Sequence, residues 1–558
     1  MNNFLNYQFR LYRTVKHLKF EQILFRFLKL FPKFYNFDIS DIKIENVKKK
    51  WIKSISNKFC SISKSQIVFL NKCVPYQKSV WHYKTESKLW NYNLNYFNFL
   101  NQKFYVNKSF FAKLIDDWIL NNNNIKNLAW DPYPTSIRIT NWIKWSLNGN
   151  KLKKVHYQSL LKQSIYLNKN IEKHLLGNHL LVNAKAIFFA GMYFNTYESD
   201  YWLKKSILIL KKEFKEQILD DGGHFERSPM YNALILEDLL DIYNIINVFD
   251  RKIFNYDKTI KSLIKINIKK MLLWQIFMSH PDGKVSFFND SCFDVANNVY
   301  DLLSYAKRLK ISTKIKKSLN SVYFKNTGYI SVRGQYLNLI ADVANLGPDY
   351  LPAHGHADSL SFEVSLKKQR VIVNSGISTY EINDQRIYER STRAHSTLML
   401  DNHDSSEVWS SFRVGRRAKI SNVNFKNNIK LKKFSASHDG YIYKKGNPIV
   451  RRIWSFEERK ISIVDTVNGS NKSNIKIYFY FHPYFKPLKV NNHEVLIKSL
   501  NQKDIFLLDF SNNVDVKIGQ SFWYPEFNKK IKNCSIELNI YQKLPIKVKS
   551  TIRLIDTA

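Results

Sequence analysis

The hydrophobic pattern of this chain changes its period once, near residues 310–321. Before this point apolar residues recur every three or four positions, which is typical of helices with a buried face. The helical spacing is clearest at Ile207, Leu210, Phe214 and Ile218. After this point apolar and polar residues alternate, as in strands with one buried face. The alternation is clearest at Ile475, Ile477, Phe479 and Phe481. The sequence therefore predicts an α+β multidomain protein, with paired helices first and an antiparallel β-sandwich second.

Length and this pattern together divide the chain into three predicted segments. The chain has 558 residues, which is more than one ordinary domain needs. We expect a partly helical N-terminal extension over residues 1–85, a helical domain over residues 86–315 and a β-sandwich domain over residues 316–558.

The charge of the chain is strongly unbalanced. Lys and Arg number 87 against 46 Asp and Glu, a formal net charge of +41. Such a surface attracts polyanions, so nucleic acid, anionic lipid and acidic polysaccharide are candidate partners. The basic residues are scattered, and no zinc-finger, helix-turn-helix, RNP or bZIP pattern accompanies them, so we expect no nucleic-acid partner. A solvated cationic surface without a specific partner is the alternative.

The sequence constrains membrane contact and compartment only weakly. No apolar run approaches the roughly 18 residues that a transmembrane helix needs, so we expect no transmembrane segment. The basic, aromatic stretch Phe4–Phe34 has helical spacing and could either lie on an anionic membrane or pack onto the protein. Four cysteines without metal spacing and an N-terminus without a signal-peptide pattern leave bacterial cytoplasm, periplasm and cell envelope open. The oligomeric state is not predicted.

Leu351–Ser361 is the stretch most typical of a functional site. It places His354, His356 and Asp358 at alternate positions. Side chains at this spacing share one face of a strand, so we expect the three groups to lie together on a strand near the start of the sandwich. A third imidazole, His395, follows after a further predicted strand. This set suits an acid–base or metal site.

Two predicted helix starts in the first half carry polar groups. At residues 177–179 the glycine can end one helix, and Asn178 and His179 can open the next. Ser228 suits a helix N-cap and would place Tyr231 in the first turn of the following helix. Because a helix N-terminus carries positive potential, we expect the phenolate form of Tyr231 to be favoured. Taken alone, both stretches also fit ordinary capped helices.

Aromatic residues beside hydrogen-bonding groups are typical of sugar-binding surfaces. The stretch Trp130-Asp131-Pro132-Tyr133 offers this combination, so Trp130 and Tyr133 are candidate glycan contacts. Aromatic residues make up 15% of the chain, and at this density we expect most of them to lie in the core.

Four motifs, taken in order, resemble the heparinase II/III family of polysaccharide lyases. They are Gly177-Asn178-His179, the Glu226–Tyr231 stretch, His354-Gly355-His356-Ala357-Asp358 and Arg393-Ala394-His395. The resemblance implies an incomplete (α/α) toroid followed by an antiparallel β-sandwich, with a glycan cleft between them. It also implies a lyase that cleaves a uronic-acid-containing acidic polysaccharide by β-elimination. A softer likeness of residues 12–19 points to bacterial surface polysaccharides.

The same resemblance implies roles for individual residues. Asn178 and His179 would neutralise the uronate carboxylate and stabilise the enolate-like intermediate. Tyr231 would act as the acid, and could also act as the base, with His354 as its acid–base partner. The candidate substrate-binding residues are Trp130, Tyr133, Arg138, Glu226 and Arg393.

In members of this family two histidines and an aspartate bind a structural metal, usually zinc. The matching positions here are His356, Asn374 and His395. An amide oxygen is a weaker zinc ligand than a carboxylate, so the resemblance implies one structural zinc ion only if Asn374 can serve. Two further hypotheses stay open: a catalytically inactive protein that binds or assembles glycans, and a metal-dependent hydrolase built on the HxHxD stretch.

Overall fold

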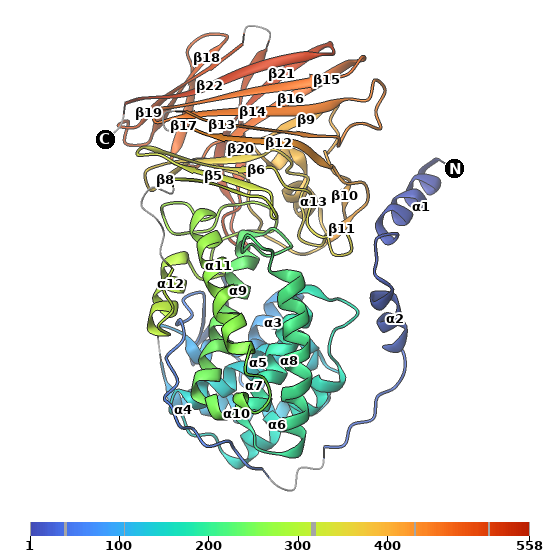
Figure 1. The fold of residues 1–558 in the computed structure, drawn as a ribbon, viewed down its shortest axis with the longest axis vertical. Helices are drawn as coiled ribbons and strands as arrows, with labels where there is room; N and C mark the ends of the chain where they lie inside the picture. Colours follow the sequence, from blue (N-terminus) through green and yellow to red (C-terminus); the bar gives the residue numbers. More distant parts are fainter. Residues whose placement is uncertain are drawn as a thin grey trace.

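The computed structural model describes residues 2–37, 42–104, 106–313, 320–428, 431–511 and 514–556. Figure 1 shows a helical half and a β half stacked along the long axis, with the N-terminal helices at one side. The last helix of the helical half ends at Arg308, and the first strand of the β half begins at Ser321. The predicted boundary at residues 315–316 lies outside the described residues.

The helical half is built from helices that pack in pairs. Their bounds are α3 (Lys88–Tyr96), α4 (Lys108–Asn121), α5 (Pro132–Leu147), α6 (Lys154–Lys169), α7 (Gly177–Tyr193), α8 (Tyr197–Gln217), α9 (Pro229–Val248), α10 (Asp250–Phe254), α11 (Ile260–Phe277) and α12 (Val299–Arg308). Short 3-10 helices lie at η1 (Asn98–Asn101) and η2 (Leu128–Trp130). α7 packs on α5 and α8, and α9 packs on α7 and α11. Short connections favour antiparallel neighbours, the arrangement expected of an (α/α) toroid.

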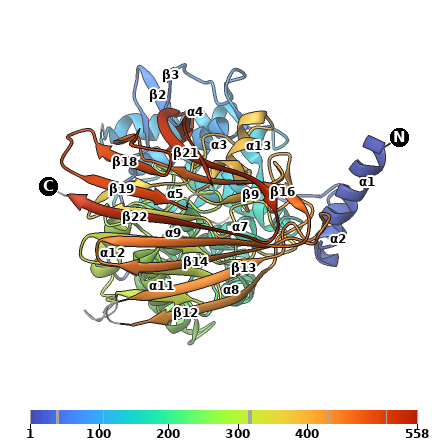
Figure 2. The same cartoon turned by 90° about the horizontal axis from the view of Figure 1, so that it is seen from above.

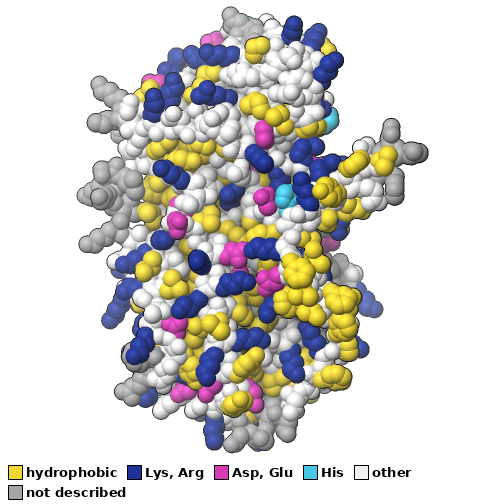
Figure 3. Space-filling view, turned by 45° about the vertical axis from the view of Figure 1, so that its right-hand side comes forward, with side chains coloured by type: hydrophobic (Ala, Val, Ile, Leu, Met, Phe, Trp, Pro, Cys, Tyr) yellow, Lys and Arg dark blue, Asp and Glu magenta, His cyan; other side chains and the backbone are white. Residues whose placement is uncertain are grey.

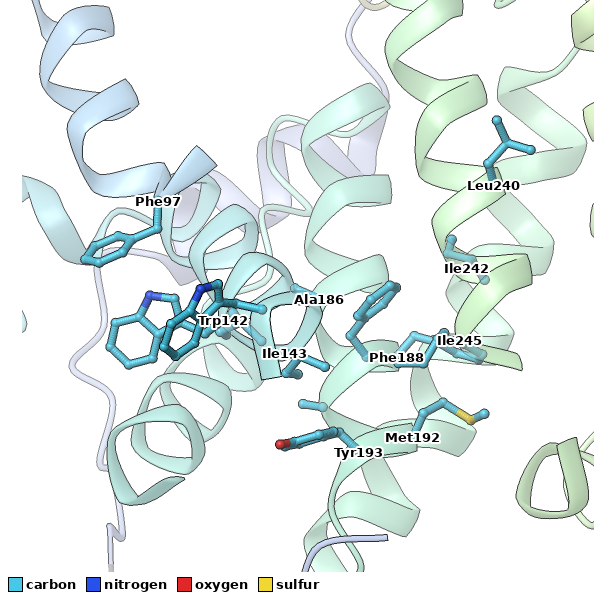
Figure 4. Close-up of a cluster of buried hydrophobic side chains, with 14 of the residues drawn as sticks. Phe97, Trp142, Ile143, Ala186, Phe188, Met192, Tyr193, Leu240, Ile242 and Ile245 are labelled. Atoms are coloured by element: carbon cyan, nitrogen blue, oxygen red, sulfur yellow. The ribbon is translucent and has the colours of Figure 1, made fainter. Parts of the chain in front are cut away.

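Apolar side chains fill the centre of this helical half. The apolar run Ile187–Phe194 of α7 and the residue after it is buried throughout. Figure 4 shows Trp142 of α5, Phe188 of α7 and Ile245 of α9 in one cluster. This packing fixes α7 against α9 and so holds the two predicted helix starts close to each other.

The N-terminal residues form two helices that project from the body (Figures 1 and 2). They are α1 (Asn2–Val15) and α2 (Phe20–Leu28). The sequence left open whether this stretch packs onto the protein or lies on a membrane. Close packing is wrong for most of its apolar side chains, because Phe20 is 76% and Phe27 58% exposed. A small antiparallel sheet follows, with strands β1 (Cys60–Ile62), β2 (Gln66–Phe69) and β3 (Lys72–Pro75). None of the described helices is long and apolar enough to cross a membrane.

The β half is antiparallel, as predicted. Its five-stranded sheet contains β4 (Ser321–Phe324), β5 (Tyr329–Arg333), β6 (Leu337–Asp342), β7 (Phe362–Leu366) and β8 (Gln369–Ile372), in that order. The eight-stranded sheet has the order β12 (Ile420–Asn427), β13 (Lys432–His438), β14 (Ile449–Glu457), β15 (Lys460–Asn468), β22 (Ile546–Asp556), β19 (Ile505–Phe510), β18 (Glu494–Ser499), β17 (Phe485–Lys489). The four-stranded sheet has the order β20 (Asp515–Trp523), β21 (Ile531–Lys543), β16 (Lys472–Tyr480), β9 (Leu398–Leu400). A short ribbon pairs β10 (Val408–Trp409) with β11 (Arg413–Val414), and α13 (Asp384–Arg390) and η3 (Thr392–Ala394) lie between β8 and β9.

Side chains from the three large sheets share one hydrophobic core. The alternating residues Ile475, Ile477 and Phe479 of β16 all point into it and are fully buried. Arg452 and Asp465 form a buried ion pair beside this core, with Nε 2.7 Å from Oδ1. The alternation in the sequence therefore identified the inward face of the sandwich correctly.

Candidate active site

The predicted catalytic residues come from three separate segments. Asn178 and His179 lie in the first turn of α7, and Tyr231 lies in the first turn of α9. The helix start at Ser228 is confirmed, because its side chain accepts a hydrogen bond from the backbone N–H of Tyr231 at 3.1 Å. Residue 177 begins α7 but does not end α6, which stops at Lys169.

The HxHxD stretch is not a strand, so this prediction is wrong. Residues 343–361 form a loop between β6 and β7. The loop turns where the N–H of Gly355 donates to the carbonyl of Pro352, and again at Leu360, whose φ of 59° is left-handed. His354 and His356 converge despite this, since both rings contact Asp290, whereas Asp358 accepts a hydrogen bond from the backbone N–H of Asn289.

Asp290 is the acceptor that orients both histidines. Its Oδ2 lies 2.7 Å from Nδ1 of His354 and its Oδ1 lies 2.8 Å from Nε2 of His356. Arg386 donates to the same carboxylate with both terminal nitrogens. Burial alone would raise the pKa of Asp290, but Arg386 and the two histidines hold it well below its usual range. An ionised Asp290 accepts the Nδ1–H of His354 and leaves Nε2 of that ring free to take a proton.

Tyr231 lies against His354, with ring centroids 4.0 Å apart and planes 30° apart. Its hydroxyl is 3.1 Å from the hydroxyl of Tyr380. Burial, together with the neighbouring Tyr380 and Asp290, raises the pKa of Tyr231 well above its usual value. The prediction that the helix N-terminus favours the phenolate is therefore wrong, because burial outweighs the helix dipole. Tyr231 is a protonated phenol at neutral pH and suits the role of an acid.

Glu226 extends the same group of side chains. Its carboxyl is buried and has no hydrogen-bond partner among the described residues; Nε2 of His354 is 3.7 Å from its Oε2. Burial raises the pKa of Glu226, and the nearby His354 and His179 offset this only in part. A buried carboxyl without a partner is costly. Glu226 is therefore suited to a ligand group that hydrogen-bonds with it.

His179 contacts Glu172 and Tyr133. Its Nδ1 is 3.1 Å from Oε2 of Glu172, and its ring centroid is 4.5 Å from that of Tyr133. Burial alone would lower the pKa of His179, but the carboxylates of Glu172 and Glu226 raise it. His179 therefore carries positive charge more readily than an isolated histidine.

A cavity of about 150 Å³ lies beside Tyr231. Its lining includes Tyr133, Asn178 and Tyr231. Its far side carries the charged residues Lys144, Lys185, Glu237, Asp238 and Asp241. Asn178 and Tyr231 thus line this cavity, and His354 and His179 lie next to its lining through their ring contacts with Tyr231 and Tyr133.

Two of the predicted substrate-binding residues, Trp130 and Arg138, lie in the core, so these two predictions are wrong. Trp130 is buried in the helical core and donates its Nε1–H to the carbonyl of Asn122. Arg138 is fully buried and stacks on Trp118, with its donors satisfied by core groups. Arg393 is exposed on η3, where its carbonyl accepts a hydrogen bond from the hydroxyl of Tyr480. Tyr133 lines the cavity and Glu226 lies beside His354, so substrate binding by these two residues and by the exposed Arg393 stays a prediction.

The three predicted zinc ligands do not assemble into one donor set. Nδ1 of His356 is 3.2 Å from Nε2 of His395, so these two rings do meet. The side-chain oxygen of Asn374 accepts a hydrogen bond from the backbone N–H of Ser396, and its amide nitrogen donates to the carbonyl of Phe287. Both ends of the Asn374 amide are therefore used in hydrogen bonds to the backbone, and the residues present do not fit the expected three-ligand zinc site.

Sequence reasoning missed three residues of the site. Asp290, Tyr380 and Arg386 contact His354 or Tyr231 or orient them, but they lie in segments without metal-like spacing or helix-start signals. The one signal that could have pointed to them is the ion pair of Asp290 and Arg386. Because these two residues lie 96 positions apart, their pairing is not visible in the sequence.

Comparison with known proteins matches nearly the whole chain to one protein family. Residues 2–315 match the description "Heparinase II/III N-terminus", and residues 316–550 match "Heparinase II/III-like, C-terminal". The heparin-sulfate lyase of Pedobacter heparinus is 28% identical over 263 residues, which cover 44% of this chain and 38% of that protein. The heparin-sulfate lyase of Bacteroides stercoris is 25% identical over 42% of this chain and 37% of that protein. The matches thus span less than half the length of these curated relatives.

Solved structures share the fold. A heparinase III structure aligns with a TM-score of 0.67 at 16% identity, covering 87% of this chain and 81% of that chain. The heparan sulfate lyase from Pedobacter heparinus aligns with a TM-score of 0.59 at 18% identity, covering 87% and 80%. This likeness confirms the predicted fold class of a helical toroid followed by a β-sandwich.

Proposed function

Since the chain belongs to the heparinase II/III family, we propose that it is a polysaccharide lyase that cleaves a uronic-acid-containing glycan by β-elimination. One observation carries this proposal: an imidazole with a free nitrogen, His354, lies against a protonated phenol, Tyr231, at the edge of one cavity. β-Elimination at a uronate needs a base for the C5 proton and an acid for the departing O4. These two side chains supply both.

In the first step, Nε2 of His354 takes the proton from C5 of the uronate. The negative charge then moves onto the uronate carboxylate, where the amide of Asn178, the imidazole of His179 and the carboxyl of Glu226 can stabilise it. The raised pKa of both His179 and Glu226 favours their protonated forms, which donate hydrogen bonds. Glu226 suits this role because its pKa is raised by burial and its oxygens have no other partner among the described residues.

In the second step, the C4–O4 bond breaks and the Tyr231 hydroxyl gives its proton to the departing O4. The products are a chain end with a C4–C5 double bond and a chain with a new hydroxyl. His354 then returns its proton, directly or through a water molecule, to the phenolate of Tyr231, whose ring lies against its own. The site thus ends each cycle with the protons where they began.

The other hypotheses find less support. A metal-dependent hydrolase would need His354, His356 and Asp358 around one metal, but the two histidines face Asp290 and Asp358 faces Asn289. A protein that binds glycans without cleaving them would not need an acid and a base in contact. The names of the relatives make heparan-sulfate-type chains one candidate substrate class.

The test is a panel of glycans, including heparan sulfate, chondroitin, hyaluronan and alginate, with ultraviolet detection of unsaturated uronate. We expect absorbance to rise with at least one glycan. Tyr231→Phe and His354→Ala should each lower the rate by about 10²-fold or more. Tyr243→Phe, which alters a buried tyrosine of the same helix, is the matched control and should keep the rate. Full activity of both site variants would refute the assignment of acid and base.

A further inference from the structure

A second cavity, of about 680 Å³, lies where the N-terminal helix meets the β half. Its lining comes from the end of α1 and the turn after it, from residues 345–349, and from residues 415–420. It contains six Lys or Arg residues and one acidic residue, Asp349: the basic ones are Arg13, Lys16, Arg227, Arg416, Arg417 and Lys419. We call this the basic cavity. Figure 3 shows Lys and Arg side chains gathered where the N-terminal helices join the body.

Specific contacts hold α1 in place along this cavity. Arg13 donates to both oxygens of Glu407, at 2.9 and 2.8 Å. Trp409 donates its Nε1–H to the hydroxyl of Thr14, and its ring meets the ring of Tyr7 edge to face at 6.2 Å. The helix is therefore docked by paired groups, although most of its apolar side chains stay exposed. Its end forms one side of the basic cavity.

The positive charge of the basic cavity is only partly neutralised by the protein. Asp349 pairs with Arg417 at 3.1 Å but is itself 71% exposed, and Glu407 is shared by Arg10 and Arg13. Within the described residues, Lys16, Arg227 and Lys419 make no ion pair with a carboxylate. An anion entering here would gain attraction from several cations at once.

Buried donors in the basic cavity lack acceptors. Nε and Nη2 of Arg417, Nε of Arg416 and Nε of Arg227 are buried and have no hydrogen-bond partner in the part of the chain that the structure describes, and the Arg417 side chain is only 8% exposed. Such donors are rare in folded proteins and cost free energy when unpaired. Guanidinium groups match the paired oxygens of sulfate, phosphate or carboxylate. Burial also lowers the pKa of Arg417 and of Arg227, and nearby carboxylates such as Asp349 offset this only in part.

The basic cavity shares structural segments with the candidate active site. Arg227 directly follows Glu226 in the chain, and its guanidinium donates to the carbonyl of Asn345. In the same loop Leu346 packs so closely on Gly355, between the two site histidines, that a Cβ there would lie 2.4 Å from it. An anion bound in the basic cavity would therefore lie on the opposite side of the loop that carries His354.

We propose that the basic cavity binds an oxyanion group, a sulfate or a carboxylate, of the acidic glycan outside the catalytic cavity. This inference rests on the proposed function for the identity of the ligand. A glycan is favoured over a membrane lipid because the unpaired donors are buried in a hollow that adjoins the active-site loop. Such a site would hold long chains better than short ones.

The first experiment uses inorganic sulfate as the probe and does not depend on cleavage. Calorimetric titration of the full chain at constant ionic strength should show saturable binding. Arg417→Gln should weaken this binding at least fivefold, and so should Lys16→Gln/Lys419→Gln, which changes two exposed residues and leaves the core intact. The matched control is Arg459→Gln/Lys433→Gln, which also removes two exposed charges. Lys433 lies at the end of β13 away from residues 415–420, and Arg459 lies in the turn after β14, so this variant should bind sulfate like the wild type. Equal sulfate binding by all variants, or none by the wild type, overturns the proposal.

The second experiment identifies the source of the oxyanion. In a Tyr231→Phe background, we compare binding of long uronate chains, short oligosaccharides of the same glycan and vesicles of anionic phospholipid. Lys16→Gln/Lys419→Gln should lower the affinity for long chains at least fivefold and leave short oligosaccharides and vesicles unchanged. Loss of vesicle binding with unchanged glycan binding overturns the proposal in favour of a membrane site. If the wild type cleaves no glycan but long chains still bind through Arg417, the proposed function fails and this inference stands.

Discussion

Nδ1 of His354 lies 2.7 Å from Oδ2 of Asp290, and Arg386 holds the same carboxylate with both of its terminal nitrogens. The guanidinium keeps Asp290 ionised, and the ionised carboxylate fixes which nitrogen of His354 carries the proton. The free Nε2 then lies 3.7 Å from Oε2 of Glu226. The base of the proposed reaction thus depends on a buried ion pair that does not itself contact the glycan.

Replacing Asp290 should therefore affect both activity and stability. Asp290→Asn should lower turnover about 10³-fold, because His354 loses its preferred tautomer. It should also lower the free energy of unfolding by about 3–5 kcal/mol, because Arg386 is left buried without a counter-charge. Turnover and urea unfolding measure the two effects. Asp465→Asn breaks the buried pair with Arg452 in the sandwich and is the control: it should lose similar stability and keep its turnover. Equal loss of turnover in both variants would show that Asp290 acts only through stability.

Tyr380 tests which phenol gives the proton. Its hydroxyl is 3.1 Å from that of Tyr231, so Tyr380→Phe removes one hydrogen bond but leaves the acid in place. We expect kcat to fall about tenfold, in line with the loss of one hydrogen bond, whereas Tyr231→Phe should fall by 10²-fold or more. Steady-state kinetics on one glycan decide between them. If Tyr380→Phe is the more damaging change, Tyr380 is the acid.

The sequence predicted the parts of the site that follow from local rules. Ser228 and Tyr231 obey helix-capping preferences, and the change of hydrophobic period separates the two halves. It mispredicted the HxHxD stretch, because alternation of short polar and small residues fits a loop as well as a strand. Burial of Tyr231, which reverses its expected ionisation, depends on packing between the two halves and could not be predicted from spacing.

The aromatic residues show the same limit. Trp130 and Tyr133 lie three positions apart and had equal claims as sugar contacts. The structure buries Trp130 in the helical core and places Tyr133 at the cavity beside His179. Which face of a segment meets the ligand is set by the packing of α5 against α3 and α7, and this is a tertiary property.

Stability should depend on pH through Glu389. Burial raises the pKa of Glu389 to about 7, above its usual value near 4.5. A carboxyl with a raised folded pKa contributes stability that is complete below about pH 4.5 and is lost as the pH rises through about 7. Glu389→Gln should therefore remove a decline of about 3 kcal/mol between these two pH values. Urea unfolding of both proteins across this range measures it; parallel curves for wild type and variant would contradict the raised pKa.

Asn374 tests the zinc expectation. In Asn374→Asp a carboxylate would face the carbonyl of Phe287, which now accepts a hydrogen bond from the amide nitrogen. We expect the variant to lose about 1–3 kcal/mol of stability and to gain no tightly bound zinc. Metal analysis and unfolding of dialysed wild type and variant provide the readouts. Stoichiometric zinc in the variant, together with higher stability, would show that the two histidines and residue 374 do form one metal site.

The chemistry of bond cleavage is tested most directly by digesting a cleaved glycan in ¹⁸O-labelled water and weighing the products by mass spectrometry. β-Elimination by His354 and Tyr231 adds no water, so the product masses should sum to that of the substrate once the exchange of reducing-end oxygens, measured on finished products kept in labelled water, is subtracted. A mass sum that exceeds the substrate by one labelled water for each bond cleaved would mean hydrolysis and would contradict the proposed lyase.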